Sequence, residues 1–144
     1  MKINLTMIFA ARACLMISCS NPNANESATK MQNLELVKNI RSAIDSNQLN
    51  KLDQYIASDA IDHDGDRSYI RGLDSIKMQM QKWHSEAEEK TEVIRELAND
   101  DYVITWTNSK GKYLTTGQGH KPGDAFTAQM VDITKVVNGK AVEH

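Results

Sequence analysis

An acidic cluster with one histidine occupies the segment AIDHDGD, residues 60–66. Its three aspartates alternate along the chain, as the acidic ligands of a calcium-binding loop do. Such a loop also needs glycine directly after the third acid and glutamate at its twelfth position, where this chain has Arg67 and Leu73. The segment therefore disfavours calcium, and we expect no metal site in the folded part of the chain.

His63, in the same segment, has two interpretations. Ala60 and Ile61 are apolar enough to be buried, and residues 64–66 (Asp-Gly-Asp) are typical of a turn. In the first interpretation His63 is an ordinary residue beside this turn, with its ring nitrogens satisfied. In the second it faces a pocket, where a histidine can exchange protons near neutral pH. We keep it as a candidate catalytic residue.

Asp132 is the main candidate for proton transfer, in the segment AFTAQMVDITKVV at residues 125–137. Alternate side chains of a strand share a face, so Asp132 shares one with Met130, whereas Val131 and Ile133 share the other. If the face with Met130 is covered, the Asp132 carboxyl is desolvated, which raises its pKa toward the range useful for a general acid or base. If Val131 and Ile133 face inward, or a bulge shifts the register, Asp132 is solvated.

His144 is placed beside Asp132 by the same alternation. The dipeptide Asn138-Gly139 predicts a tight turn that returns the final segment KAVEH, residues 140–144, next to the strand of Asp132. An inward His144 would form an acid/base pair with an inward Asp132, and the carboxylate would favour the imidazolium. The alternative is a frayed histidine at the end of the strand.

These residues must be positioned by helices first and strands second. Apolar residues recur at helical spacing in residues 31–48, 49–57 and 72–89, which predicts three amphipathic helices. After Lys90 the pattern has period two and is interrupted by NDD, NSKGK, GQGHKPGD and NGK. This predicts antiparallel strands over residues 91–97, 102–107, 112–117, 125–137 and 140–144. The order favours an α+β domain with helices covering one face of a curved sheet.

Four larger side chains are candidates for the wall of a cavity between the helices and the sheet. They are Tyr55, Trp83, Trp106 and Met130. Such a cavity suits a small, largely apolar ligand, although each of these residue types also serves as ordinary core packing.

The N-terminal segment has the layout of a bacterial export signal. It holds Lys2, a mostly apolar run and small residues around Cys19, with Arg12 interrupting the run. Residues 16–19 (Met-Ile-Ser-Cys) resemble a lipoprotein box, in which the cysteine becomes the lipidated first residue. We therefore expect a signal peptide over residues 1–18, lipidation of Cys19, and a flexible polar tether over residues 19–30. The alternatives are a plain cleaved signal or an uncleaved N-terminus.

Composition limits the partners and the chemistry. Both cysteines, at positions 14 and 19, lie in the leader, so residues 31–144 have no thiol for a disulfide, a nucleophile or a thiolate metal site. The net charge of −2 becomes more negative without the leader, which argues against nucleic acid as a partner. We find no phosphate-binding loop, nucleophile elbow or histidine-metal spacing, and we expect no cofactor.

The order of segments from residue 31 to residue 144 resembles the nuclear transport factor 2-like superfamily, and within it the SnoaL-like polyketide cyclase group. The most specific part is VDITKVVNGKAVEH, because members typically end in a strand, an Asn-Gly or Asp-Gly turn and a returning strand similar to GKIVEHWD. The resemblance implies a cone-shaped α+β fold, with three N-terminal helices packed on a curved, mainly antiparallel sheet. It also implies a position for His63 at the pocket mouth. The sequence stops at His144, where relatives continue, so we expect unpaired backbone groups near the end of the last strand.

Three kinds of function fit these observations, and the fold alone does not choose among them. The first is a SnoaL-like cyclase, isomerase or hydrolase in which Asp132 moves a proton and His63 or His144 orients the substrate oxygen. The second is a lipoprotein of the bacterial envelope, or a secreted or periplasmic protein, that binds a small hydrophobic molecule without turnover. The third is a domain that pairs through its sheet, for instance as a homodimer.

Overall fold

The computed structural model describes residues 22–63, 69–117 and 119–144. The helices are α1 (Pro22–Asp45), the 3-10 helix η1 (Leu49–Gln54) and α2 (Leu73–Glu86). The strands are β1 (Ile56–Asp62), β2 (Ile70–Arg71), β3 (Ala87–Ala98), β4 (Tyr102–Tyr113), β5 (Ala125–Val137) and β6 (Lys140–Glu143). The α+β class and the order of helices before the long strands agree with the prediction.

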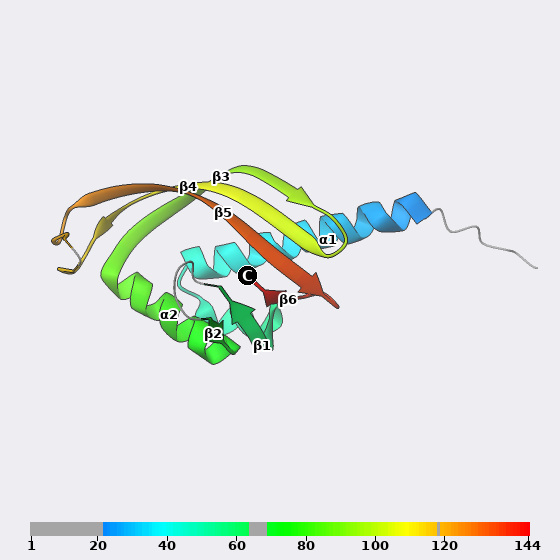
Figure 1. The fold of residues 1–144 in the computed structure, drawn as a ribbon, viewed down its shortest axis with the longest axis horizontal. Helices are drawn as coiled ribbons and strands as arrows, with labels where there is room; N and C mark the ends of the chain where they lie inside the picture. Colours follow the sequence, from blue (N-terminus) through cyan, green and yellow to red (C-terminus); the bar gives the residue numbers. More distant parts are fainter. Residues whose placement is uncertain (1–21, 64–68, 118) are drawn as a thin grey trace, which may run out of the picture.

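All six strands form one mixed sheet in the order β2-β1-β6-β5-β4-β3. Neighbouring strands are antiparallel except for β1 and β6, which are parallel. The long strands β3, β4 and β5 arch over α1, while α2 and the short strands β1, β2 and β6 lie below them (Figure 1). The sheet thus curves around the space that Asp132 and His144 line.

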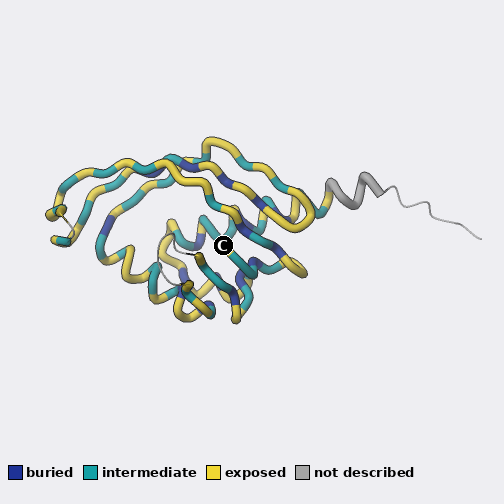
Figure 2. The backbone as a smooth tube through the Cα atoms, viewed as in Figure 1, coloured by how far each residue is buried: buried dark blue, intermediate teal, exposed yellow. Residues whose placement is uncertain are grey.

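The hydrophobic core lies under the arch, where helices and short strands meet. Its buried members are Ala43, Leu49, Leu52, Ile56, Ala60, Leu73, Ile76 and Ala141. They come from α1, η1, β1, α2 and β6. Figure 2 marks buried positions along the backbone in dark blue. The outer sides of the long strands are mostly exposed.

Several predicted boundaries differ from the structure. The helix expected from residue 31 begins at Pro22, so residues 22–30, expected as tether, belong to α1. The second helix is a 3-10 helix that ends at Gln54, because β1 begins at Ile56 and is held beside Ala141 of β6. The third ends at Glu86, where Ala87 takes extended backbone angles and begins β3.

The predicted turn at NSKGK does not exist, because β4 continues through it to Tyr113. Gly111 explains the difference. A Cβ on Gly111 would clash with the carbonyl oxygen of Glu88. It would also lie 2.5 Å from Cζ of Phe126, the residue of β5 that is paired with Gly111. The glycine therefore marks a close approach between strands and not a change of direction.

The C-terminal hairpin has the predicted turn. Asn138 and Gly139 both have positive φ, 51° and 72°, as a two-residue hairpin turn requires. The backbone at the end of the last strand is paired, contrary to expectation. The N–H of His144 donates to the carbonyl of Ile61 at 2.9 Å, and its carbonyl accepts from the N–H of His63 at 2.7 Å.

None of the helices in the described part of the chain is both long and apolar enough to span a membrane.

Candidate functional site

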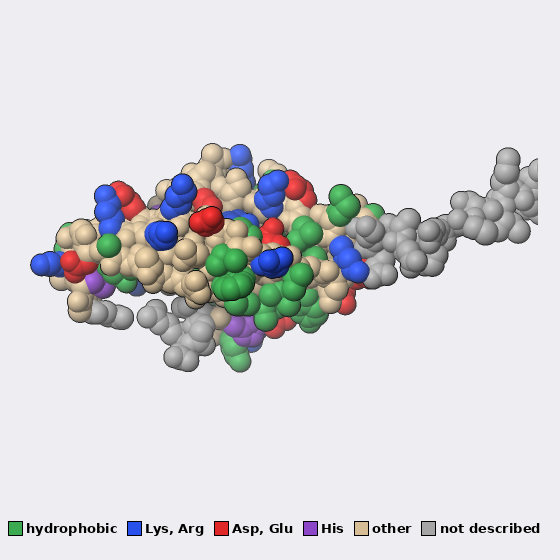
Figure 3. Space-filling model, turned by 90° about the horizontal axis from the view of Figure 1, so that it is seen from above, with side chains coloured by type: hydrophobic (Ala, Val, Ile, Leu, Met, Phe, Trp, Pro, Cys, Tyr) green, Lys and Arg blue, Asp and Glu red, His purple; other side chains and the backbone are tan. Residues whose placement is uncertain are grey.

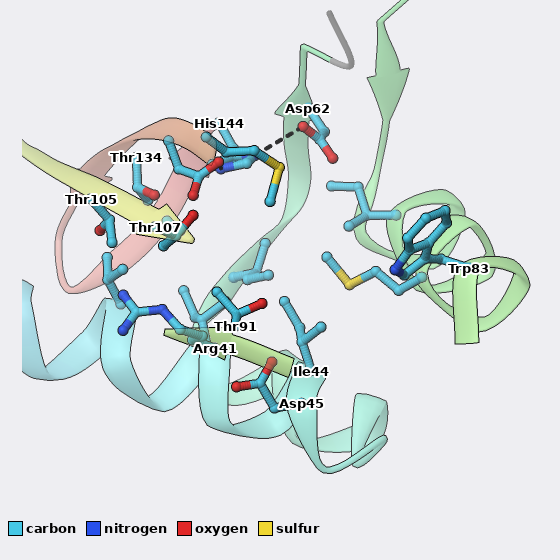
Figure 4. A pocket seen from close by; sticks show the side chains of 18 of the residues that line it. Arg41, Ile44, Asp45, Asp62, Trp83, Thr91, Thr105, Thr107, Thr134 and His144 are labelled. Atoms are coloured by element: carbon cyan, nitrogen blue, oxygen red, sulfur yellow. Dashed lines mark hydrogen bonds and ion pairs between the residues drawn. The ribbon is translucent and has the colours of Figure 1, made fainter. Parts of the chain in front are cut away.

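A cavity of about 490 Å³ lies between the inner face of the sheet and the two α-helices. Its walls are largely apolar and include Val37, Ile40, Ile44, Ile56, Ile76 and Met80. Polar side chains enter it mainly from the strands, as the close view in Figure 4 shows. The cavity thus has the mixed lining typical of small-molecule sites, which are apolar with a few placed polar groups.

Asp132 faces this cavity from β5. Met130 and Thr134 line the cavity with it, whereas Val131 and Ile133 are 63% and 53% exposed on the outer face. This is the inward orientation that the alternation allowed. Burial raises the pKa of the Asp132 carboxyl, and the positive charge of His144 opposes this rise. The carboxyl therefore binds a proton more readily than an exposed aspartate does.

His144 lies between two carboxylates. Its Nδ1 is 3.1 Å from Oδ1 of Asp62, a contact drawn as a dashed line in Figure 4. Its Nε2 is 3.8 Å from Oδ1 of Asp132. The hydrogen bond with Asp62 raises the pKa of His144, partial burial opposes this, and the charge of Asp132 raises it further. The arrangement favours an imidazolium, in which both ring nitrogens carry hydrogen.

The central position of β6 brings these three residues together. β6 is hydrogen-bonded to β1 on one side and to β5 on the other. Ile61, next to Asp62, is paired with Glu143, and Glu143 is also paired with Lys135 of β5. His144, one residue further, consequently reaches both Asp62 and the inner face of β5.

Within the described part of the acidic segment, Asp62, and not His63, is the titratable residue that lines the cavity. The ring of His63 does not line the cavity; its Nε2 lies 2.8 Å from Oε1 of Glu143, and its plane meets the ring of Tyr69 edge-on at 4.6 Å. His63 thus contacts Glu143, which lines the cavity, and its catalytic role stays a prediction. The predicted turn at residues 64–66 lies outside the described residues.

Three threonines that we had not predicted form a polar floor. Thr105, Thr107 and Thr134 are buried and line the cavity. Oγ1 of Thr107 has no hydrogen-bond partner within the described residues. Their alternation with larger residues is visible in VITWTNS, residues 103–109. We had expected the larger side chains of this strand to face inward, and so overlooked the threonines.

The predicted wall residues divide into two pairs. Trp83 and Met130 line the cavity. Trp106 does not: it is 43% exposed on the outer face, because β4 turns Thr105 and Thr107 inward. Tyr55 packs against the core from another side and lines a separate groove beside α1.

Arg41 of α1 is a further charged residue of the cavity that the sequence reasoning missed. Its Nη2 lies 2.5 Å from Oε1 of Glu96 on β3, and the Thr105 hydroxyl donates to the same oxygen at 3.5 Å. The guanidinium is thereby held beside the threonine floor. No group of three or more His, Cys, Asp or Glu among the residues that the structure describes is arranged to hold a metal ion. Cys19, the predicted lipidation site, lies outside those residues.

Solved structures similar to this one share the architecture. A candidate polyketide cyclase from Xanthomonas campestris pv. campestris has a TM-score of 0.74 at 16% identity, covering 80% of this chain and 88% of that chain. The candidate polyketide cyclase IdmH from Streptomyces antibioticus has a TM-score of 0.67 at 23% identity, covering 78% and 88%. An epoxide hydrolase of the LEH-like type from M. tuberculosis has a TM-score of 0.64 at 13% identity, covering 79% and 80%. At these identities the likeness establishes the fold.

The family comes from the sequence itself. A comparison with curated proteins gives no significant match. The model of the SnoaL-like domain, however, matches residues 37–144, which include all the strands and every residue that lines the cavity around Asp132. The chain therefore belongs to the SnoaL-like domain family and has the nuclear transport factor 2-like fold.

Proposed function

We propose that this protein is an enzyme that transfers a proton on a small, largely apolar molecule bound in the cavity, with Asp132 as the acid/base group. The observation that carries the proposal is the line of Asp62, His144 and Asp132 on the cavity wall, joined at 3.1 Å and 3.8 Å. A carboxyl with a raised pKa beside an imidazolium is suited to proton exchange near neutral pH.

The chemistry follows from the charges of these groups. The Asp132 carboxylate takes a proton from a carbon beside a carbonyl group, and the electrons of the C–H bond move to the carbonyl oxygen. The imidazolium of His144 donates its Nε2–H to that oxygen, while Asp62 holds the ring through Nδ1. The resulting enolate is the nucleophile of an aldol cyclisation or the intermediate of an isomerisation. Hydrolysis, the reaction named for the M. tuberculosis neighbour, would need the same base to act on water.

Proton exchange in heavy water tests the proposal without knowledge of the natural substrate. Small aryl ketones that fit the cavity are incubated with the protein, and loss of their α-proton signal is followed by NMR. The wild-type protein should accelerate exchange, Asp132→Asn should abolish the acceleration, and Asp59→Asn, which changes an exposed carboxylate of β1, should leave it intact. Exchange that survives in Asp132→Asn would contradict the proposal, and absence of acceleration with bound ketone would favour binding without turnover.

Pairing of two copies through the sheet is a second candidate property, favoured by an apolar patch on the outer face. The patch, called here the outer apolar patch, consists of Leu97, Ile104, Trp106, Val131 and Ile133, which are 39% to 63% exposed. Ile104 is paired with both Leu97 and Ile133, and Trp106 with Val131, so the members are neighbours. Apolar side chains gather on the same face in Figure 3. Contiguous apolar surface of this kind marks interaction sites.

The leader supports a position in the bacterial cell envelope. The lipoprotein-type box that ends at Cys19 would anchor the mature protein to a membrane through lipid, with the cavity in the periplasm or at the cell surface. This part of the proposal depends on the sequence alone.

A further inference from the structure

The cavity is lined by many more acidic than basic side chains. Its carboxylates are Asp45, Asp62, Glu88, Glu89, Asp132 and Glu143. Arg41 is the single Lys or Arg among the described lining residues, and its guanidinium is bound to Glu96. The remaining lining side chains are apolar, neutral polar or histidine, so the acidic groups outnumber the basic ones and set the sign of the potential inside.

Two of these carboxylates take part in no ion pair of the described chain, although the charges of Arg41 and His84 act on Asp45. Glu88 is paired with Lys112 at 2.9 Å, Glu143 lies near Lys135 and His63, and the other two inner aspartates share His144. Asp45 and Glu89 form no ion pair with any Lys, Arg or His of the described chain. Both belong to the end of the cavity made by the last turn of α1 and the start of β3.

Besides burial, the charge of Glu89 raises the pKa of two other carboxyl groups of the cavity, Asp45 and Asp132. Burial is the main cause that raises the pKa of Asp45. The charges of Arg41 and His84 oppose this rise, and the charge of Glu89 adds to it. Burial likewise raises the pKa of Asp132, with Glu89 again among the groups that add to the rise. A positive charge placed near Glu89 would relieve this repulsion at both aspartates.

An aromatic wall stands beside these carboxylates. Nε1 of Trp83 donates to Oε2 of Glu89 at 2.7 Å, which fixes the indole at the cavity. An aromatic face with carboxylates around it is the usual chemistry for holding an ammonium group. Asp45, Trp83 and Thr107 enter the same space from α1, α2 and β4 in Figure 4.

The threonine floor adds an independent sign of a missing ligand. Thr107 is 2% exposed and lines the cavity, yet its hydroxyl has no partner within the part of the chain that the structure describes. A buried hydroxyl without a hydrogen bond is unfavourable, so a ligand whose polar group reaches Thr107 would satisfy it. The walls also carry apolar side chains, among them Ile44 and Met80.

We propose that the cavity selects small apolar amines over neutral or acidic molecules of the same shape, with the ammonium group beside Asp45 and Glu89 at the Trp83 wall and the apolar body along Ile44 and Met80. The inference rests on the proposed function in one respect, that the cavity is the ligand site. It does not depend on turnover by Asp132, which the proton-exchange experiment tests separately.

Calorimetric titration with three probes of one skeleton tests this selectivity: naphthylmethylamine, naphthylmethanol and naphthoate, at neutral pH and low ionic strength. The amine should bind about tenfold more tightly than the alcohol, and naphthoate should bind most weakly. Added salt should narrow these differences for the wild-type protein, because it screens charges that reach solvent. This salt series needs no variant and so does not depend on how any variant folds.

Variants then locate the effect. Asp45→Asn combined with Glu89→Gln should bring the affinity for the amine down to that for the alcohol, with the alcohol itself unchanged. Glu92→Gln is the matched control, since Glu92 lies on the same strand as Glu89 but is exposed and does not line the cavity. Equal binding of amine and alcohol, or an amine preference that persists in the double variant, would overturn the charge selectivity while leaving the cavity as the ligand site. No binding of the amine up to its solubility limit would overturn it as well.

Discussion

The contact between Asp62 and His144 predicts that Asp62→Asn destabilises the protein in a pH-dependent way. Asparagine keeps the size of the side chain and one acceptor oxygen but removes the charge. A hydrogen bond to a charged partner contributes about 1.5–3 kcal/mol when it is sheltered from water. The side chain of His144 is 48% exposed and that of Asp62 is 20% exposed, so solvent screening weakens the hydrogen bond. We therefore expect the variant to lose about 1 kcal/mol of stability.

The sign of the pH dependence follows from the direction of the shift. Asp62 raises the pKa of His144 above its ordinary value of 6.5, so the folded protein holds this proton more tightly than the unfolded chain. The stabilisation is fully present below that value and is lost as the pH rises through the pKa of His144 in the folded protein. The variant should therefore lose about 1 kcal/mol near pH 5.5 and almost nothing near pH 9.

Urea denaturation of the wild-type protein and Asp62→Asn at these two pH values measures the difference. An NMR titration of the His144 ring should show a lower pKa in the variant. Asp59→Asn serves as the control, because Asp59 is an exposed carboxylate of the same strand. An equal loss of stability at both pH values, or an unchanged His144 titration, would refute the role that we give to Asp62.

Three further predictions concern other parts of the chain. Gly111→Ala should lower stability by about 1–3 kcal/mol in thermal melts, because its Cβ would meet the ring of Phe126; an unchanged midpoint would show that the strands can separate without cost. Val131→Lys with Ile133→Lys should convert any dimer to monomer in sedimentation analysis, and a wild-type monomer at high concentration would argue against pairing through the outer apolar patch. Cys19→Ser should abolish acyl labelling and release the protein from membranes of its host, whereas labelling that persists would contradict lipidation at this residue.

Most correct predictions about the site came from the alternation of side chains along the strands. It allowed the inward orientation of Asp132, and the Asn138-Gly139 turn correctly indicated that the last strand returns beside it. His144 was consequently identified from local pattern alone. These predictions succeeded because period-two alternation and two-residue turns are set by the backbone of a few neighbouring residues.

The failures come from contacts between segments far apart in the sequence. Trp106 was assigned to the cavity by its size, but β4 places Thr105 and Thr107 on its inner face, so Trp106 between them lies on the outer face. Asp62 was overlooked in favour of His63, because only the parallel pairing of β1 with β6 shows which of the two neighbours meets His144. Gly111 was taken as a turn signal, although its role depends on a ring in the next strand.

A bound ammonium group and the acidic neighbours would change the pKa of Asp132 in opposite directions. Burial and the acidic neighbours raise the pKa of Asp132, which strengthens it as a base, whereas a bound ammonium near Glu89 would lower that pKa and weaken it. His144 already lowers the pKa of Asp132 from the other side. A protein that both attracts amines and uses Asp132 as a base therefore benefits from holding the ammonium at the Asp45 end. The position of the two unpaired carboxylates on α1 and β3, and not on the strand of Asp132, is consistent with that requirement.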